Sequence, residues 1–272
     1  MMRIVVCVKA VPASTEVRMD PVTHTIVRDG GSAVVNPFDA AALEVALRIK
    51  EERAAQGLDS RVSVLSMGIP ATEELLRDCI ARGADEALLL SDRAFAGADT
   101  LATSYALSCG LRELGGFDLI ICGKMAVDGD TAQIGPMLAG LFDVPCITDV
   151  REALVPVPGS DASPGRIRAR HGVDGGIETV EVPLPAVITV AKDIAQPRMP
   201  SIAGVLASRD AEVAVRGAAE VGADAARIGL SGSPTQVVRS FVPERANAVE
   251  LIEGTVAEQA RRVAELIGEA GR

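Results

Sequence analysis

Short apolar runs alternate with longer segments of helical periodicity through the first 150 residues, and this alternation constrains the fold more than any other feature. The first run, residues 4–8, is continuously apolar, which is typical of a strand buried on both faces of a parallel sheet. The strands expected on this basis span residues 4–8, 61–66, 87–90 and 118–122. The helices expected between them start at Asn36-Pro37, an N-cap followed by a first-turn proline, and span 71–82, 100–114 and 131–142. The predicted fold class is α/β, with a doubly wound, mostly parallel sheet.

A different pattern follows residue 150. Segments 150–157, 165–171 and 178–182 predict an added antiparallel segment, and residues 186–190 predict a return to a buried strand. Earlier in the chain, two short pieces around Asp20-Pro21 at 16–19 and 25–28 predict a surface hairpin.

The C-terminal third loses regular periodicity for about 60 residues. Only 212–215 predicts a strand there, before an amphipathic helix expected over 254–270. A structureless stretch of that length is unusual inside a compact domain. We therefore expect a nucleotide-binding α/β domain over 1–192 and an extended C-terminal arm over 193–272 that wraps a partner chain.

The charge balance excludes several classes of function. Thirty-seven acidic residues outnumber 27 basic ones, which gives a net charge of −10. A chain this acidic would repel nucleic acid and offers no polybasic membrane anchor. No apolar run approaches the roughly 20 residues that span a bilayer, so we expect no membrane insertion. The five cysteines occur singly, which predicts free thiols in a reducing cytoplasm.

Ligands of open α/β sheets bind at the carboxyl ends of the strands. Several predicted loops meet there: the ends of the first two strands, the start of the first helix and the loop over 123–136. The candidate nucleotide-binding residues in these loops are Cys7, Ala10, Asn36, Asp39, Met67, Gly123, Lys124, Asp128, Gly129, Asp130, Thr131, Ala132, Gln133 and Gly135.

The loop over 123–136 carries the strongest signal. Its glycines, Gly123 and Gly129, allow close backbone approach, and we expect free N–H groups at a helix start over 131–133 to hold a phosphate. Lys124 would add positive charge. Asp128 and its neighbour Asp130 would repel phosphate, so we expect them to cap the helix or to hold ribose hydroxyls. The spacing alone leaves open a plain capped helix after a loop.

Catalysis by this chain's own side chains is not expected. The GxGxxG, GxxxxGK[ST] and GxSxG motifs are absent. His24 and His171 lack a second ligand nearby, which argues against a metal site and a catalytic triad. Cys7 and Cys122 end buried strands, where they are expected to form an apolar wall.

Taken together, these loops resemble the beta subunit of electron-transfer flavoproteins over nearly the whole chain. No single motif is decisive, but the ordered set is very specific. The matching motifs are Val8-Lys9-Ala10-Val11-Pro12, Asp20-Pro21-Val22, Arg28-Asp29-Gly30, Asn36-Pro37-Phe38-Asp39, Gly83-Ala84-Asp85, the loop over 123–136, Asp174-Gly175-Gly176-Ile177-Glu178-Thr179, Leu184-Pro185-Ala186-Val187 and Pro197-Arg198.

The resemblance implies a heterodimer with an alpha subunit, which holds most of the redox-active FAD, while the beta chain holds a second nucleotide. That nucleotide is AMP in ordinary members and a second FAD, reduced by NADH, in electron-bifurcating members. The run over 128–136 and the tail over 229–237 look like the bifurcating pattern, so FAD is favoured and AMP stays the alternative. The implied redox partners are an acyl-CoA-type dehydrogenase, a quinone reductase or ferredoxin.

The same resemblance implies a docking segment after the Pro-Arg pair. Ile202 takes the anchor position, Met199 replaces the usual tyrosine, and Val205 follows. Burial of these side chains against the alpha subunit is the alternative.

Two functions of other classes stay open on the residues alone. A free-standing adenine-nucleotide-binding sensor of the same fold would need no alpha subunit. A nucleotide hydrolase would need a nucleophile and a base that the sequence does not offer.

Overall fold

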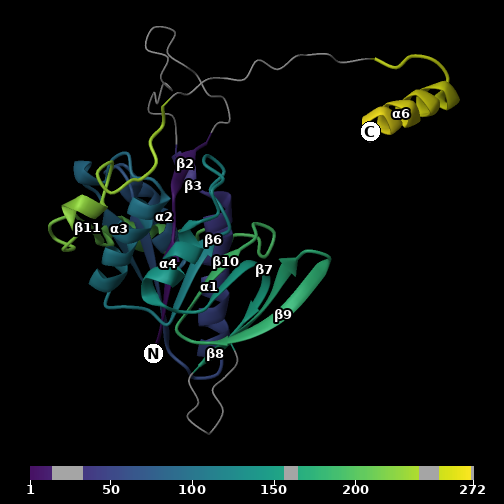
Figure 1. Ribbon diagram of the computed structural model, residues 1–272. Coiled ribbons are helices and arrows are strands. Elements are labelled where there is room, and N and C mark those ends of the chain that lie inside the picture. The colour runs from purple at the N-terminus through teal and green to yellow at the C-terminus, as the bar shows by residue number, and fades with distance from the viewer. Residues whose placement is uncertain (14–32, 156–164, 239–250, 271–272) are drawn as a thin grey trace.

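A mixed sheet forms the centre of the structure, a computed structural model that describes residues 1–13, 33–155, 165–238 and 251–270 (Figure 1). Among the described residues it has nine strands in the order β11-β5-β4-β1-β6-β10-β7-β8-β9. The hairpin predicted over 16–28, together with His24, lies outside the described residues.

The parallel part of the sheet contains the strands predicted from apolar runs. Its central strands pair in register, so that Cys7 lies opposite both Leu65 and Cys122. The parallel strands and their bounds are β1 (Met2–Cys7), β4 (Ser60–Met67), β5 (Glu86–Leu90), β6 (Leu119–Gly123), β10 (Ala186–Val190) and β11 (Val213–Arg216).

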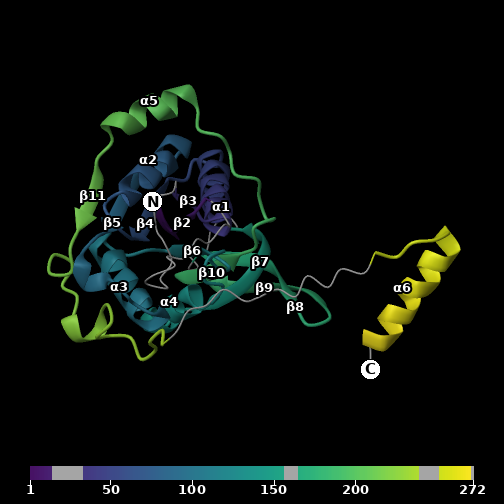
Figure 2. The ribbon, with the colours of Figure 1, turned by 90° about the horizontal axis from the view of Figure 1, so that it is seen from above.

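Helices cover both faces of this parallel part, which confirms the doubly wound α/β prediction (Figure 2). On one face lie α1 (Pro37–Ala54) and α2 (Thr72–Arg82), and on the other lie α3 (Thr100–Glu113) and α4 (Ile134–Phe142). Two hydrophobic cores result, one on each side of the sheet. Each fully buried Leu or Ile side chain stabilises such a core by about 1.5–3 kcal/mol.

The predicted antiparallel segment is present as β7 (Cys146–Leu154), β8 (Arg166–Val173) and β9 (Gly176–Pro183). The strand β7 begins four residues before its predicted start, because it pairs with β10 from Cys146 onward. The final residues of the predicted strand over 150–157 lie outside the described residues.

The C-terminal third contains more regular structure than its sequence predicts. Ser201 caps a helix that was not predicted, α5 (Ile202–Asp210), by accepting a hydrogen bond from the Gly204 N–H. The following strand, β11, extends the sheet beside β5, and a 3-10 turn, η2 (Ala225–Arg227), comes after it; another, η1 (Arg93–Phe95), follows β5. The predicted final helix is present as α6 (Val256–Ala270) and lies apart from the sheet in both views (Figures 1 and 2).

A small antiparallel sheet of β2 (Ala10–Pro12) and β3 (Ala33–Val35) stands above the carboxyl edge of the main sheet. No helix in the described part of the chain has the length and apolar character needed to cross a membrane.

Candidate functional site

The carboxyl edge of the sheet has its topological switch point between β1 and β6. The chain leaves β1 through α1 toward β4 on one side, and it later returns to β6 on the other. Ligands of doubly wound sheets bind in the crevice at this point. The ends of β1, β4 and β6 bring the predicted site residues Cys7, Met67 and Gly123 to this edge, and Ala10 opens β2 beside them.

Asp39, in the first turn of α1, joins the two strands that flank the switch point. Its Oδ2 accepts the Lys9 N–H at 2.8 Å, and its Oδ1 accepts the Gly123 N–H at 3.0 Å. The residue is only 7% exposed. Burial raises the pKa of Asp39 to about 7, although hydrogen bonds from Lys9, Asn36 and Gly123 act in the opposite direction. The buried Asp39 carboxyl therefore holds in place the two segments that follow β1 and β6.

Asn36 stands at the predicted N-cap of α1, but its side chain does not cap the helix. Instead its Nδ2 donates to the Met125 carbonyl at 2.9 Å, and its Oδ1 accepts the Val127 N–H at 3.2 Å. The amide thus pairs with the backbone of the loop that follows β6 in both directions. Asn36 and Asp39 together hold this loop against the start of α1.

The loop after β6 ends in strained backbone. Asp130 and Ala132 have positive φ angles of 48° and 54°, which side chains other than glycine rarely adopt. A left-handed residue cannot continue a right-handed helix. For this reason α4 starts at Ile134, three residues later than predicted, with Gln133 at its N-cap position.

The N–H groups expected to be free over 131–133 are free in the structure, although they precede the helix. No acceptor is found, among the described residues, for five consecutive backbone N–H groups, those of Thr131, Ala132, Gln133, Ile134 and Gly135. Alternation of left- and right-handed backbone, as at Ala132 and Gln133, lets successive N–H groups converge on an anion. This run of donors, residues 131–135, is called the donor loop below.

Both lysines at the site already have carboxylate partners. Lys9 Nζ lies 2.6 Å from Asp128 Oδ1, and Lys124 Nζ lies 3.1 Å from Asp149 Oδ1. The structure thus does not support a helix-capping role for Asp128, and Lys124 points its charge at β7 rather than standing free for a phosphate. An anion at the donor loop would be held chiefly by backbone dipoles.

The glycines of the site serve different purposes. A Cβ on Gly123 would overlap Asp39 Oδ1 and lie 2.6 Å from Phe38 Cβ, so this glycine is required by the packing of α1. A Cβ on Gly135 would overlap Thr189 Cγ2, which lets α4 approach β10. The space beside Gly129 is open, with only Lys9 Nζ at 3.9 Å. Of the three, Gly129 alone faces space that a ligand can use.

The two cysteines at the switch point form part of the hydrophobic core beneath α3 and α4. The neighbouring Cys7 thiol and burial raise the pKa of Cys122 well above its usual range. This thiol therefore stays protonated at neutral pH, in agreement with the predicted apolar wall.

The predicted docking residues gather at α5, away from the switch point (Figure 2). Met199 and Ile202 are each 83% exposed, and Val205 is 38% exposed. Leu206, which was not among the predicted docking residues, is 55% exposed and extends the same apolar surface.

This exposed surface is attached firmly to the body. Arg198 bonds through its Nε to Glu44 Oε2 at 2.8 Å, and it also pairs with Glu51. At the other end of α5, Arg77 Nη1 donates to the carbonyls of residues 208, 209 and 211. A Cβ on Gly204 would overlap the Ala81 carbonyl, so α5 rests directly on the backbone of α2. None of these anchors was predicted, because the partners are distant in sequence.

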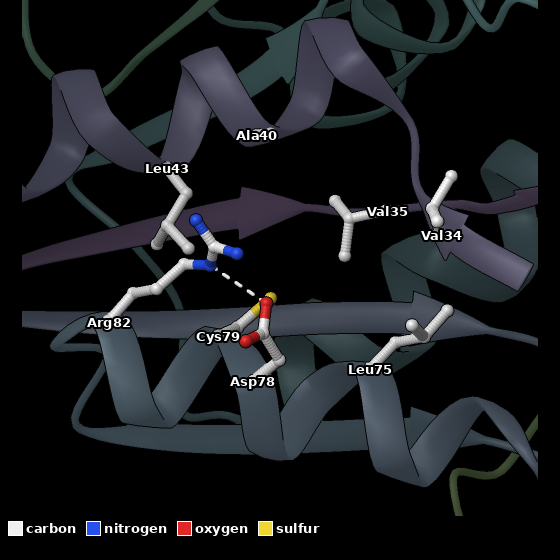
Figure 3. Close-up of a pocket in the computed structure, with 8 residues that line it drawn as sticks. All are labelled: Val34, Val35, Ala40, Leu43, Leu75, Asp78, Cys79 and Arg82. Atoms are coloured by element: carbon white, nitrogen blue, oxygen red, sulfur yellow. Dashed lines mark hydrogen bonds and ion pairs between the residues drawn. The ribbon is translucent and has the colours of Figure 1, made fainter. Parts of the chain in front are cut away.

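A separate cavity of about 190 Å³ opens between α1, α2 and β3 (Figure 3). It is lined mainly by apolar side chains, and the Arg82–Asp78 ion pair of 2.7 Å lies within it. None of the predicted site residues lines it. In the part of the chain that the structure describes, no group of three or more His, Cys, Asp or Glu side chains is arranged to hold a metal ion.

Comparisons with known proteins agree with one another. Residues 23–221 match the model of the electron transfer flavoprotein domain. The caffeyl-CoA reductase-Etf complex subunit CarD of Acetobacterium woodii is 40% identical over 258 residues, which cover 95% of this chain and 94% of that protein. The electron transfer flavoprotein subunit beta of Megasphaera elsdenii is 43% identical over 248 residues, 89% of this chain and 88% of that protein. Protein FixA of Azotobacter vinelandii is 41% identical over 257 residues, 93% and 88% of the two chains.

Proposed function

The chain belongs to the electron transfer flavoprotein family, and from that premise we propose that it is the beta subunit of an electron-carrying heterodimer and holds FAD at the carboxyl edge of its sheet. The donor loop would bind the phosphates of the nucleotide. The ends of β1, β4 and β6 would surround its remaining part.

The observation that carries this proposal is the row of five N–H groups beside the switch point that have no acceptor in the described part of the chain. Backbone donors that converge without an acceptor are costly unless a ligand or water satisfies them. Two left-handed residues hold the loop in this form, and such strain persists where the surrounding structure fixes it. Asn36 and Asp39 fix the segment over 123–127 that leads into the donor loop, which suits a preformed anion site.

FAD rather than AMP is proposed for two reasons. The run Asp128-Gly129-Asp130 and the residues after it resemble the bifurcating members, and so does the tail over 229–237. The relative from Acetobacterium woodii is named as a subunit of a caffeyl-CoA reductase-Etf complex. A bound flavin supplies the electron chemistry, with NADH as the proposed donor, while the protein sets position, distance and potential.

The alpha subunit is the proposed partner of the C-terminal arm over 193–272. The helix α6 presents Val256, Val263 and Ile267 to solvent, at 82%, 44% and 68% exposure. An exposed apolar stripe at helical spacing is stabilised when it packs into a groove of another chain. The surface of α5 would meet the redox partner, an acyl-CoA-type dehydrogenase, a quinone reductase or ferredoxin.

The test uses a substitution that fills the open space beside Gly129, just before the donor loop. Gly129→Val should fold normally, because only Lys9 Nζ lies near the added atoms, and should weaken nucleotide binding by roughly tenfold or more. Gly176→Val is the matched control, since it adds the same atoms where nothing lies within 4 Å. Nucleotide retained by the purified complex is measured by chromatography after denaturation. Equal retention in both variants would show that the donor loop is not the site.

A further inference from the structure

The tail segment over 229–235 packs closely at two glycines, one against the body and one against the turn that precedes it. Gly229 has a φ of +54°, and a Cβ there would overlap the Ala94 carbonyl. A Cβ on Gly232 would overlap the backbone of Arg227. Backbone thus packs directly on backbone at two points, which no larger residue permits. This segment is called the tail turn below.

Asp99 joins the tail turn to the start of α3. Its Oδ1 caps the helix by accepting the N–H groups of Leu101 and Ala102, at 3.0 and 3.1 Å. Its Oδ2 accepts the Thr235 N–H at 3.2 Å and the Thr235 hydroxyl at 2.8 Å. Its own N–H donates to the Ser233 hydroxyl at 2.8 Å. One carboxylate therefore holds both the first turn of α3 and the tail turn.

Thr100, the residue after Asp99, contacts the donor loop. Thr100 Oγ1 donates to Gln133 Oε1 at 2.7 Å, across the gap between α3 and α4. Gln133 stands at the N-cap position of α4 and belongs to the donor loop. Since its oxygen accepts from Thr100, its Nε2 is left as the free donor, and among the described residues nothing accepts from it.

We propose that Thr100 and Asp99 are positioning residues for the nucleotide, and that the tail turn acts as a brace that holds them in place. This inference rests on the proposed function of the donor loop. The Thr100 hydroxyl orients the Gln133 amide so that its NH2 group faces an anionic or carbonyl oxygen of a nucleoside phosphate. The brace gives the tail over 229–237 a role at the nucleotide site, although this tail lies about 100 residues from the donor loop in sequence.

The brace works through a short chain of hydrogen bonds. Thr235 fixes Asp99, Asp99 fixes the first turn of α3, and Thr100 in that turn fixes Gln133. Each link joins groups that are partly exposed, so a single hydrogen bond changes binding severalfold rather than abolishing it.

The test compares isosteric threonine variants in the full-length complex with its alpha subunit. Thr100→Val removes the hydroxyl that reaches Gln133, and Thr235→Val removes one of two bonds to Asp99. Thr103→Val, on the same helix, is the matched control, because no described residue bonds its hydroxyl. The two readouts are the dissociation rate of the bound nucleotide and the hydrogen exchange of amides over 126–134.

Thr100→Val should raise the dissociation rate by roughly threefold to tenfold, and Thr235→Val by less. The double variant should dissociate no faster than Thr100→Val alone, because Thr235 acts through Thr100. Both single variants should increase exchange in the donor loop, and Thr103→Val should change neither readout.

Two results would overturn the proposal. One is a Thr235→Val variant whose added exchange stays within 229–238. The other is equal behaviour of Thr100→Val and Thr103→Val. A complex that holds no nucleotide would contradict the proposed function instead, and the exchange measurement would still decide whether the tail turn braces the loop.

Discussion

At the scale of single residues, Asp39 shows how one buried side chain builds the site. Its two oxygens each accept a backbone N–H, one at the end of β1 and one at the end of β6. A carboxylate in water would stay charged at neutral pH, but burial raises the pKa of Asp39 to about 7. The site therefore contains a group that titrates near physiological pH.

A pH dependence of stability follows from this raised pKa. The folded protein holds the Asp39 proton up to about pH 7, whereas the unfolded chain releases it near pH 3.8, the ordinary pKa of an aspartate. The contribution of Asp39 to the free energy of unfolding is therefore fully present below pH 4 and is lost as the pH rises to 7. Asp39→Asn removes this slope, so the free-energy advantage of the wild type should shrink by on the order of 3 kcal/mol between pH 4 and 7.5. Urea unfolding at both pH values measures it, and a constant difference would contradict the prediction.

Gly123 is the second residue whose identity matters at the site, because the packing of α1 leaves no room for a side chain there. Gly123→Ala places a methyl group against Asp39 and Phe38, and we expect a loss of about 1–3 kcal/mol in the free energy of unfolding. Gly129→Ala, where the space is open, should change it by less than about 0.5 kcal/mol. Denaturant unfolding of both variants measures the contrast. Equal losses would argue against the close contact between β6 and α1.

At the scale of elements, the helix α5 is held firmly in place, as the proposed docking surface requires. Its inner side rests on the backbone of α2 through Gly204, and Arg198 and Arg77 hold its two ends. Its outer side exposes apolar side chains. A surface that is already ordered loses less conformational entropy when it binds.

Gly204→Val tests this attachment. The added atoms overlap the Ala81 carbonyl, so α5 should separate from α2, and hydrogen exchange over 201–210 should rise by at least tenfold while the sheet stays protected. Gly140→Val in α4 is the control, since it makes the same change in a helix where nothing lies within 4 Å. Unchanged exchange in α5 would show that this helix does not depend on the contact.

Element boundaries also show where prediction from sequence succeeds. The strands β1, β4, β5 and β6 were predicted correctly, because burial on both faces favours apolar side chains, although β4 also buries Ser63 and Ser66. The start of α4 was predicted three residues too early. Ala132 has a left-handed backbone that keeps it out of the helix, but alanine normally favours helix, so the sequence does not reveal this conformation. The helix α5 was missed because its apolar side chains face solvent, so the usual buried stripe is absent, and because Pro197 and Pro200 shortly precede it.

The site was predictable only in part for a related reason. Topology brings the loop ends together, which identifies Asn36, Asp39 and the loop after β6. The pairing of Lys9 with Asp128, and of Thr100 with Gln133, depends on side chains far apart in sequence. Their charges and hydroxyls indicate no particular partner until the fold is known.

At the scale of the whole molecule, the arm over 193–272 is part body and part extension. In its first portion α5 packs on α2 and β11 extends the sheet, and its last portion ends in α6, apart from the sheet (Figures 1 and 2). We expect α6 to pack on the alpha subunit through its apolar stripe.

Val263→Glu tests this contact, because it places a charge in the stripe of an exposed helix without disturbing the fold. The dissociation constant of the heterodimer should rise by roughly tenfold or more. Arg261→Glu introduces the same residue on the opposite side of the helix and should have a much smaller effect. Analytical ultracentrifugation at dilute concentration measures both, and equal effects would contradict the packing of this stripe.

The central claim is that this chain holds FAD within a heterodimer, and counting the nucleotides tests it most directly. The chain is co-expressed with its alpha subunit, the complex is purified and denatured, and the released nucleotides are quantified per heterodimer. We expect two FAD and no AMP per heterodimer. One FAD with one AMP would contradict FAD at the beta site, and a complex without any nucleotide at this site would contradict the donor loop as a binding site.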